Sequence, residues 1–267
     1  MRTGIMGICK ALGLYSLIFI RWNRRWKIFA SVPNDDKSIT CLSMIKTNPL
    51  AAAWLFIILS VGAALIFDAH QYPLLVKEGG IIESLSALGY FVCVAAMFYR
   101  GGADFAKRYH YLIMLITLFG MRELDFDKRF TTMGILKSRF YTGDLVPLGE
   151  KLIGVVVILV LLYVVIRIIK AHTSTFVTGV KNRVSWHLGA LSVIGALVFS
   201  KSIDGLGRKL GDVGITVDPL VATYFSTIEE VLELGIPVLI FVTFTLYMSD
   251  SGAKASLNGP HPNSTET

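Results

Sequence analysis

Pairs of acidic residues recur four positions apart within otherwise apolar parts of this sequence. Glu123 precedes Asp127 by four positions, and Glu229 precedes Glu233 by four, with Glu230 between them. Residues four apart share a face of a helix, so each pair would place two like charges side by side. Each carboxylate then needs a proton, a cation or a basic partner, as general acid–base catalysis or proton binding also requires. These five residues are the candidate catalytic carboxylates.

A second set of ionisable residues could hold a substrate or pair with these carboxylates. Asp125 with Arg129, and Asp204 with Arg208, have the spacing to satisfy each other along one helix. Basic residues on other helices could neutralise a crowded carboxylate or bind an anionic group. A basic and aromatic segment, residues 137–141, could bind a lipid phosphate or simply lie against the headgroups. The candidate substrate-binding residues are Glu83, Arg122, Lys137, Arg139, Lys201, Asp204 and Arg208.

The sequence carries no familiar cofactor signature. It has no HExxH or HxxxH pattern, no Walker A or GxGxxG pattern, and no CxxC or haem-attachment pattern among its 3 cysteines. A histidine-based metal site and a built-in nucleotide site are therefore disfavoured. A divalent cation bound by carboxylates alone remains open, so the cofactor is unknown.

The elements that must position these residues are long apolar helices. The chain of 267 residues is 54% hydrophobic and 17% charged, whereas soluble domains are about 25% charged. A helix needs ~20 apolar residues to span a bilayer. Six stretches qualify, at residues 50–69, 81–99, 109–127, 152–169, 186–203 and 219–248. We predict an all-α integral membrane bundle of about six transmembrane helices over residues 49–248, with Pro237 kinking the last one.

The segments on either side of this bundle are expected to differ from it. The apolar run at 11–20 is too short to span and has basic residues on both sides, which favours an interfacial amphipathic helix. A seventh span there is the alternative. With an interfacial helix, residues 1–48 form a cytoplasmic segment, whereas a seventh span would put the N-terminus outside. Residues 249–267, rich in Ser, Gly, Asn and Pro, predict a disordered cytoplasmic tail.

The distribution of charge predicts the orientation. With both termini inside, one face of the membrane carries sixteen basic and five acidic residues, and the other carries ten basic and fourteen acidic residues. Lys and Arg favour the cytoplasmic side, so both termini are predicted to be cytoplasmic. Glu83, Arg122, Lys201 and the Glu229–Glu233 segment then fall into one layer in the outer leaflet. The basic residues behind the net charge of +7 flank apolar blocks, so a nucleic-acid partner is not predicted.

Four segments resemble an uncharacterised family of bacterial multi-pass inner-membrane proteins. They are residues 121–131 (MRELDFDKRFT), 137–141 (KSRFY), 200–205 (SKSIDG) and 229–233 (EEVLE). The resemblance covers residues 78–237, and the RELDFDKRFT string is its most specific part. It implies a location in the bacterial inner membrane, and it brings no activity with it.

Three functions fit these observations. The first is a membrane-embedded enzyme acting on a lipid or lipid-linked substrate from the outer leaflet. The second is a proton- or cation-coupled transporter that uses the same carboxylates. The third is a non-catalytic assembly or accessory protein, in which the charges only fix the packing of the bundle. Membrane lipids are expected partners, and another membrane protein is a further one under the third hypothesis. The oligomeric state is not predicted.

Overall fold

Every regular element that the structure describes is an α-helix. The computed structural model describes residues 48–66 and 80–257, with side chains as far as Ser251. The predicted interfacial helix at 11–20 lies outside these residues. The helices are α3 (Pro49–Ile66), α5 (Ile81–Arg108), α6 (His110–Glu123), α7 (Phe126–Phe130), α8 (Ser138–Thr142), α9 (Leu148–Lys181), α10 (Ser185–Ile203), α11 (Leu206–Asp212) and α12 (Pro219–Leu257). The predicted all-α membrane fold is confirmed.

Five of these helices are long and apolar enough to cross a membrane, namely α3, α5, α9, α10 and α12. The chain is therefore a multi-pass membrane protein. The prediction of six spans is not confirmed, because α6 has only 14 residues. The predicted span at 109–127 ends early because the backbone leaves the helix at Leu124, and Asp125 then adopts a left-handed φ of 49°. At the other end of the bundle, α12 continues past the predicted boundary at Met248 to Leu257.

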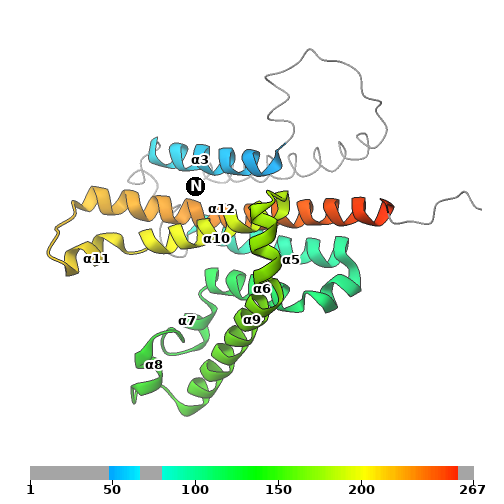
Figure 1. Ribbon diagram of the computed structural model, residues 1–267. Coiled ribbons are helices and arrows are strands. Elements are labelled where there is room, and N and C mark those ends of the chain that lie inside the picture. The colour runs from blue at the N-terminus through cyan, green and yellow to red at the C-terminus, as the bar shows by residue number, and fades with distance from the viewer. Residues whose placement is uncertain (1–47, 67–79, 258–267) are drawn as a thin grey trace, which may run out of the picture. The chain divides into compact units, whose positions relative to one another are not determined.

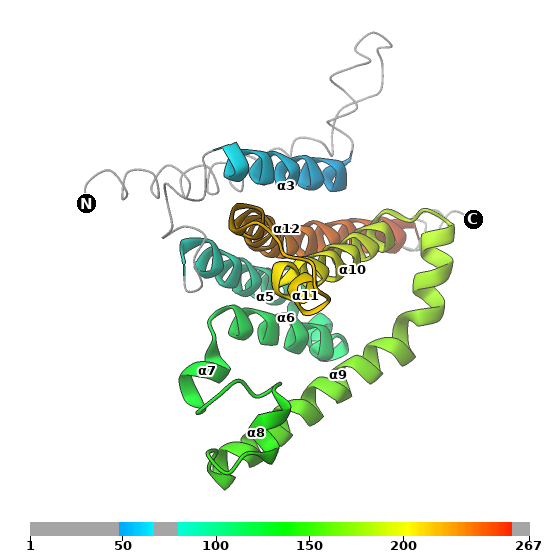
Figure 2. The ribbon, with the colours of Figure 1, turned by 90° about the vertical axis from the view of Figure 1, so that its left-hand side faces the viewer.

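Helix α12 lies at the centre of the packing. It contacts α3, α5 and α10, and Figure 2 shows α3 and α5 on opposite sides of it. Helix α6 packs along α5, while α9 contacts α6 and α10 over shorter lengths. The part of α9 next to α8 lies away from α10 and α12 in both ribbon views (Figures 1 and 2). Helix α12 therefore packs against three of the other four spanning helices that the structure describes.

Small residues allow α12 to approach its neighbours closely. A Cβ added at Gly235 would lie 2.7 Å from a side-chain carbon of Ile57 on α3. A Cβ added at Gly89 of α5 would lie 2.9 Å from the Pro237 ring. In a bilayer, helices associate through such close backbone packing rather than through exclusion of water. Glycine at these two positions is thus a packing requirement.

Pro237 leaves one backbone carbonyl of α12 without its helical hydrogen-bond donor, and α5 supplies another donor. A proline has no N–H, so the carbonyl of Glu233, four residues earlier, loses its usual hydrogen bond. The hydroxyl of Ser86, which is fully buried, donates to that carbonyl at 2.9 Å. The Cys93 thiol donates to the carbonyl of Pro237 itself at 3.2 Å. The segment of α12 around Pro237 is therefore held against α5 by two hydrogen bonds, and α12 continues as one helix through the proline.

One end of the bundle is built from hydrogen-bonded aromatic rings. Tyr109, between α5 and α6, bonds to Tyr247 of α12 with 2.8 Å between the hydroxyl oxygens. Tyr111 of α6 bonds to His172 of α9 at 2.6 Å, and Trp186 at the start of α10 meets Tyr247 edge to face. We call these five residues the aromatic end. Burial, followed by the hydrogen bond with Tyr247, raises the pKa of Tyr109 to about 12.

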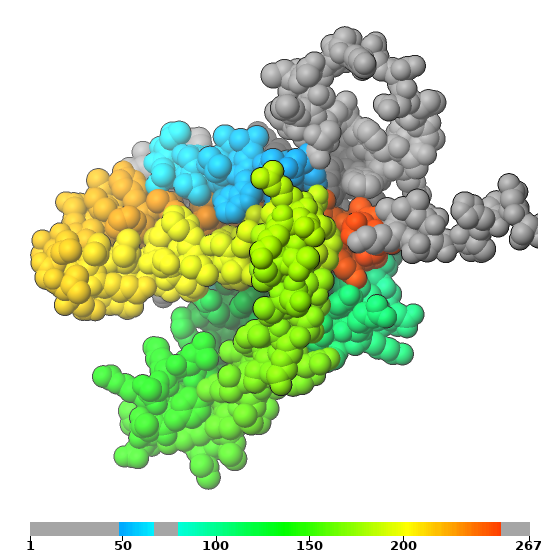
Figure 3. All heavy atoms as spheres, viewed as in Figure 1, coloured from blue at the N-terminus to red at the C-terminus, as the bar shows by residue number. Residues whose placement is uncertain are grey.

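The opposite end carries most of the candidate carboxylates and their basic partners. Helix α6 ends there at Glu123, α10 ends two residues after Lys201, and α12 passes through with Glu233. Figure 3 shows the yellow surface of α10 and α11 beside the orange start of α12 at this end. We call it the charged end. Because α6 joins the aromatic end to the charged end, it runs antiparallel to α5 despite its short length.

The connection between α6 and α9 packs on α9 through its own small core. Phe140 is fully buried there together with Ile135 and Val146. The backbone N–H of Thr132 donates to the Glu150 carboxylate at 2.7 Å, which ties the start of the connection to the first turn of α9. The connection therefore lies on α9 through apolar contacts, which include Val157.

Candidate functional site

The side chain of Glu233 is the centre of the charged end. Glu233 is only 9% exposed, yet its carboxylate contacts groups from two other helices. Lys201 Nζ of α10 lies 2.7 Å from Glu233 Oε1, and an Arg122 Nη of α6 lies 3.5 Å from the same oxygen. The Ser200 hydroxyl, fully buried, donates to that oxygen at 3.4 Å. One carboxylate thus joins three helices.

Lys201 has more than one acidic partner. Its Nζ lies 3.6 Å from Glu229 Oε1, one turn before Glu233 on α12, and 3.3 Å from Asp204 Oδ2. Glu229 and Glu233 were predicted to be like-charged neighbours in need of a basic partner from another helix. The structure supplies that partner, and it is one of the residues that the sequence had suggested. The Lys201 side chain is 36% exposed, so this network is half-buried.

The local chain path explains why Asp204 turns toward Lys201. Helix α10 ends at Ile203, and Gly205 adopts a left-handed φ of 60° before α11 begins. Because the helix is interrupted, Asp204 and Arg208 do not share one helical face, and the predicted pair between them is wrong. In its place Asp204 pairs with Lys201, three residues earlier. The predicted Asp125–Arg129 pair fails for a similar reason, since Asp125 precedes α7 and pairs with Lys128 at 2.7 Å.

Two further carboxyl groups lie close to this network without a basic partner in it. Glu123, 7% exposed, ends α6, and Glu230 lies on α12 beside Glu229. In the part of the chain that the structure describes, no ion pair within 4 Å joins either of them to a cation. Glu233 is among the charges that act on both. Such groups need a proton, a cation or a polar group of a ligand.

The charged end gathers most of the candidate residues. Glu83, at the start of α5, lies within electrostatic range of Glu123 and Glu230. Asp204 lies within range of Glu229. The charged end therefore combines the following candidates from α5, α6, α10 and α12: Glu83, Arg122, Glu123, Lys201, Asp204, Glu229, Glu230 and Glu233. We call these eight residues the acidic–basic cluster.

Four candidates lie elsewhere. Asp127 is on α7, and its carboxylate and the Lys137 side chain both approach Gly134 rather than α12. Because the helix breaks at Leu124, the predicted side-by-side arrangement of Glu123 and Asp127 is wrong. Arg139 is exposed on α8. Arg208 is exposed on α11, where its guanidinium lies over Gly205.

Sequence reasoning missed the two hydroxyl groups that hold Glu233. Ser200 donates to its side chain and Ser86 to its backbone carbonyl. Serine in a membrane helix usually bonds to its own backbone, so neither residue stands out by type. A signal for Ser86 did exist, because Pro237 requires a donor for the carbonyl of residue 233. It could not indicate which helix supplies that donor.

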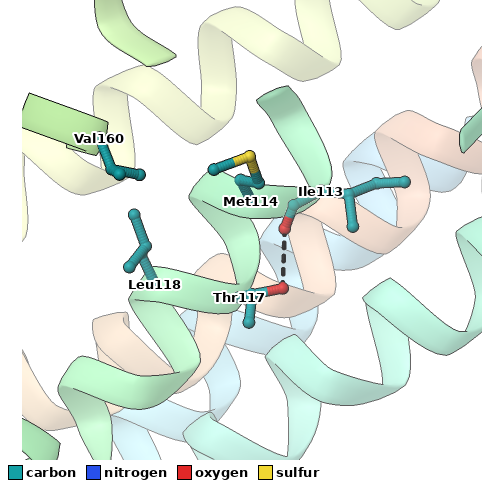
Figure 4. Close-up of a pocket in the computed structure, with 5 residues that line it drawn as sticks. All are labelled: Ile113, Met114, Thr117, Leu118 and Val160. Atoms are coloured by element: carbon teal, nitrogen blue, oxygen red, sulfur yellow. Dashed lines mark hydrogen bonds between the residues drawn. The ribbon is translucent and has the colours of Figure 1, made fainter. Parts of the chain in front are cut away.

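The described residues include no group of three or more His, Cys, Asp or Glu side chains arranged to hold a metal ion. The cofactor thus stays unassigned. A groove of about 180 Å³ lies between α6 and α9, and a cavity of about 340 Å³ lies by the α9–α10 turn next to Trp186. Figure 4 shows the first of these. Neither is lined by a residue of the acidic–basic cluster.

No protein-family model matches this chain, and neither a curated protein nor a solved structure matches it. The family resemblance of the RELDFDKRFT segment remains a prediction.

Proposed function

We propose that this chain is a bacterial inner-membrane enzyme that uses the acidic–basic cluster to act on a lipid or lipid-linked substrate from the outer leaflet. Glu123 and Glu230 would donate protons, and Glu233 would accept them. Lys201 and Arg122 would bind an anionic group of the substrate. A carboxylate-bound divalent cation is compatible with this scheme and is not required by it.

The observation that carries the proposal is the unequal surroundings of carboxyl groups at one place. Glu233 has two cations beside it, whereas Glu123 and Glu230 have none within ion-pair distance among the described residues. Unequal surroundings divide a set of carboxyl groups into proton acceptors and proton donors. An array that served only to pack helices would be expected to pair each buried charge.

The depth of the cluster suits a lipid headgroup. From Trp186 to Lys201, α10 advances ~22 Å, compared with ~30 Å for the hydrocarbon core of a bilayer. If the helix is centred, the aromatic end and the charged end each lie within about one helical turn of a hydrocarbon boundary. Tryptophan and tyrosine are enriched at such boundaries. A substrate headgroup could therefore reach the cluster without crossing the membrane.

The charges near the aromatic end support the outward orientation of the cluster. Near that end, the residues whose side chains the structure describes include seven basic and two acidic ones: Arg100, Lys107, Arg108, Arg167, Lys170, Lys181, Arg183, Asp104 and Asp250. Basic residues favour the cytoplasmic side, which would turn the charged end outward.

An accessory role is the second candidate, because the Lys201–Glu233 pair links α10 to α12 and Arg122 links α6 to α12. A transporter is less well supported. Along α12, the residues from Gly235 to Val242 are apolar, and the hydroxyl of Thr243 bonds to its own helix. This stretch offers few polar groups to an ion moving between the two ends.

Substitution of the unpaired carboxyls tests the proposal. A deletion strain would be complemented with the wild-type chain, Glu123→Gln or Glu230→Gln, and with Asp104→Asn as a control at the aromatic end. Protein abundance in membranes and the lipid profile would both be measured. We expect normal abundance for all variants, with only the two glutamine variants retaining the altered lipid profile of the deletion. Loss of abundance in the glutamine variants would instead indicate the accessory role, and a normal lipid profile in both would refute the enzyme.

A further inference from the structure

A groove on the side of α6 that faces α9 has apolar walls. It is lined by Ile113, Met114, Thr117, Leu118 and Val160. Figure 4 shows Met114 and Leu118 pointing toward Val160 across the gap between the two helices. The one polar wall residue, Thr117, donates its hydroxyl to the carbonyl of Ile113 at 2.8 Å and so makes no demand on a ligand. The groove can therefore accept an apolar chain without leaving a polar group unsatisfied.

The groove lies at hydrocarbon depth, where the surrounding solvent is lipid. Val160 lies in the middle of α9, which has the highest mean hydropathy of the spanning helices. Water is excluded at that depth, so an open apolar groove is filled by acyl chains or by another helix. The choice between these depends on what lies at the ends of the groove.

A cation lies at the end of the groove nearest the cluster. Met114, Leu118 and Arg122 follow one another at intervals of four residues, so Arg122 lies one helical turn, ~6 Å, beyond Leu118 toward the charged end. The Arg122 side chain is 47% exposed, although it also contacts Glu233 at 3.5 Å. A half-exposed arginine at the boundary of the hydrocarbon is suited to bind a phosphate, because its planar fork of N–H groups matches the phosphate oxygens.

We propose that the α6–α9 groove binds one acyl chain of an anionic phospholipid whose phosphate binds Arg122. The apolar walls, the depth of the groove and the position of the cation agree on the same occupant. A helix from another protein would meet the arginine without an obvious counter-charge. Naming this lipid as the substrate class rests on the proposed function, whereas the binding itself does not.

The test measures lipids retained by the purified full-length protein. Native mass spectrometry would compare phosphatidylglycerol with phosphatidylcholine of the same acyl chains, and with glycerol phosphate, which lacks the tails. Leu118→Trp and Val160→Phe fill the groove from opposite walls, and Arg122→Gln removes the cation. Leu162→Trp, at a lipid-facing position of α9 that is 51% exposed, is the matched control.

We expect the wild-type protein and Leu162→Trp to retain phosphatidylglycerol in preference to both other probes. Arg122→Gln should lower that retention about fivefold, the effect of one basic residue near a membrane surface. The two groove variants should lower the retention of both phospholipids. Unchanged retention of phosphatidylglycerol in Arg122→Gln would overturn the phosphate contact, and equal retention of the two phospholipids by the wild-type chain would overturn the choice of an anionic headgroup. Unchanged retention in both groove variants would overturn the acyl site.

These outcomes separate the binding site from the enzyme. If phosphatidylglycerol binds as expected while Glu123→Gln complements the deletion strain fully, the lipid site stands and the proposed catalysis fails. If the glutamine variants lose function while the groove variants retain lipid normally, the catalysis stands with a differently bound substrate.

Discussion

The hydrogen bond from Ser86 to the carbonyl of Glu233 makes a specific prediction about Pro237. In the wild-type chain the serine replaces the helical donor that proline lacks. Ser86→Ala removes this donor and leaves a buried carbonyl unsatisfied. Pro237→Ala restores a backbone N–H at the position from which a helix normally donates. The serine should therefore matter only while the proline is present.

The expected magnitude follows from the burial of the two groups. Leaving a buried acceptor unsatisfied costs about 1–3 kcal/mol in general, but hydrogen bonds between membrane helices average about 0.6 kcal/mol and reach about 1.7. The Ser86 hydroxyl is fully buried and its 2.9 Å bond is well formed, so we expect Ser86→Ala to lower the free energy of unfolding by about 1 kcal/mol. In the Pro237→Ala background we expect the same substitution to cost roughly a quarter of that or less.

The assay is equilibrium unfolding in mixed micelles of the four proteins of this double-mutant cycle. The loss of helix is monitored by circular dichroism. The cycle removes the separate effect of losing the Pro237 ring against Gly89. Ser84→Ala is the matched control, because Ser84 is exposed and donates to Gly80 at the start of its own helix. Its cost should be small and equal in both backgrounds. An equal cost of Ser86→Ala with and without the proline would refute the reasoning.

Three other predictions concern the two ends of the bundle. Lys201→Met should lower the free energy of unfolding by about 2 kcal/mol. This value lies between those for exposed and buried ion pairs, because the Lys201 side chain is 36% exposed. Lys201→Arg keeps the charge and should recover most of the lost stability. Gly179→Ala places a methyl group against the histidine ring at the start of α10 and should cost about 1–3 kcal/mol, whereas Gly195→Ala, with open space around it, should be neutral or stabilising in the same unfolding assay. Because the folded pKa of Tyr109 is raised to about 12 from its ordinary 10.0, its contribution to stability should be complete below pH 10 and lost as the pH rises through 12. The free energy of unfolding of Tyr109→Phe should consequently fall less over that range than that of the wild type, and parallel pH profiles would contradict this.

The amino-acid sequence alone was sufficient for the membrane fold. Apolar stretches of about 20 residues cannot be accommodated on a soluble surface, and in lipid only a helix satisfies their backbone groups. The helices α3 and α10 were therefore predicted nearly to their ends, whereas α5, α9 and α12 continue well past the predicted spans, to Arg108, Lys181 and Leu257. Glu123 and Glu233 could also be identified as candidate site residues, because an acidic residue within such a stretch is costly unless it is paired or functional.

Tertiary structure decided how these residues pair. Spacing along one helix suggested that Asp204 pairs with Arg208, but the chain turns at Gly205, and Asp204 pairs with Lys201 instead. No glycine or proline next to Glu123 indicated that α6 would end there. Spacing determines only which residues share a helix face, while the partner of a charge depends on which helix packs opposite. The contact of α12 with α5, α6 and α10 brought Lys201, Arg122 and two serines to Glu233, and no local pattern in the sequence contains that information.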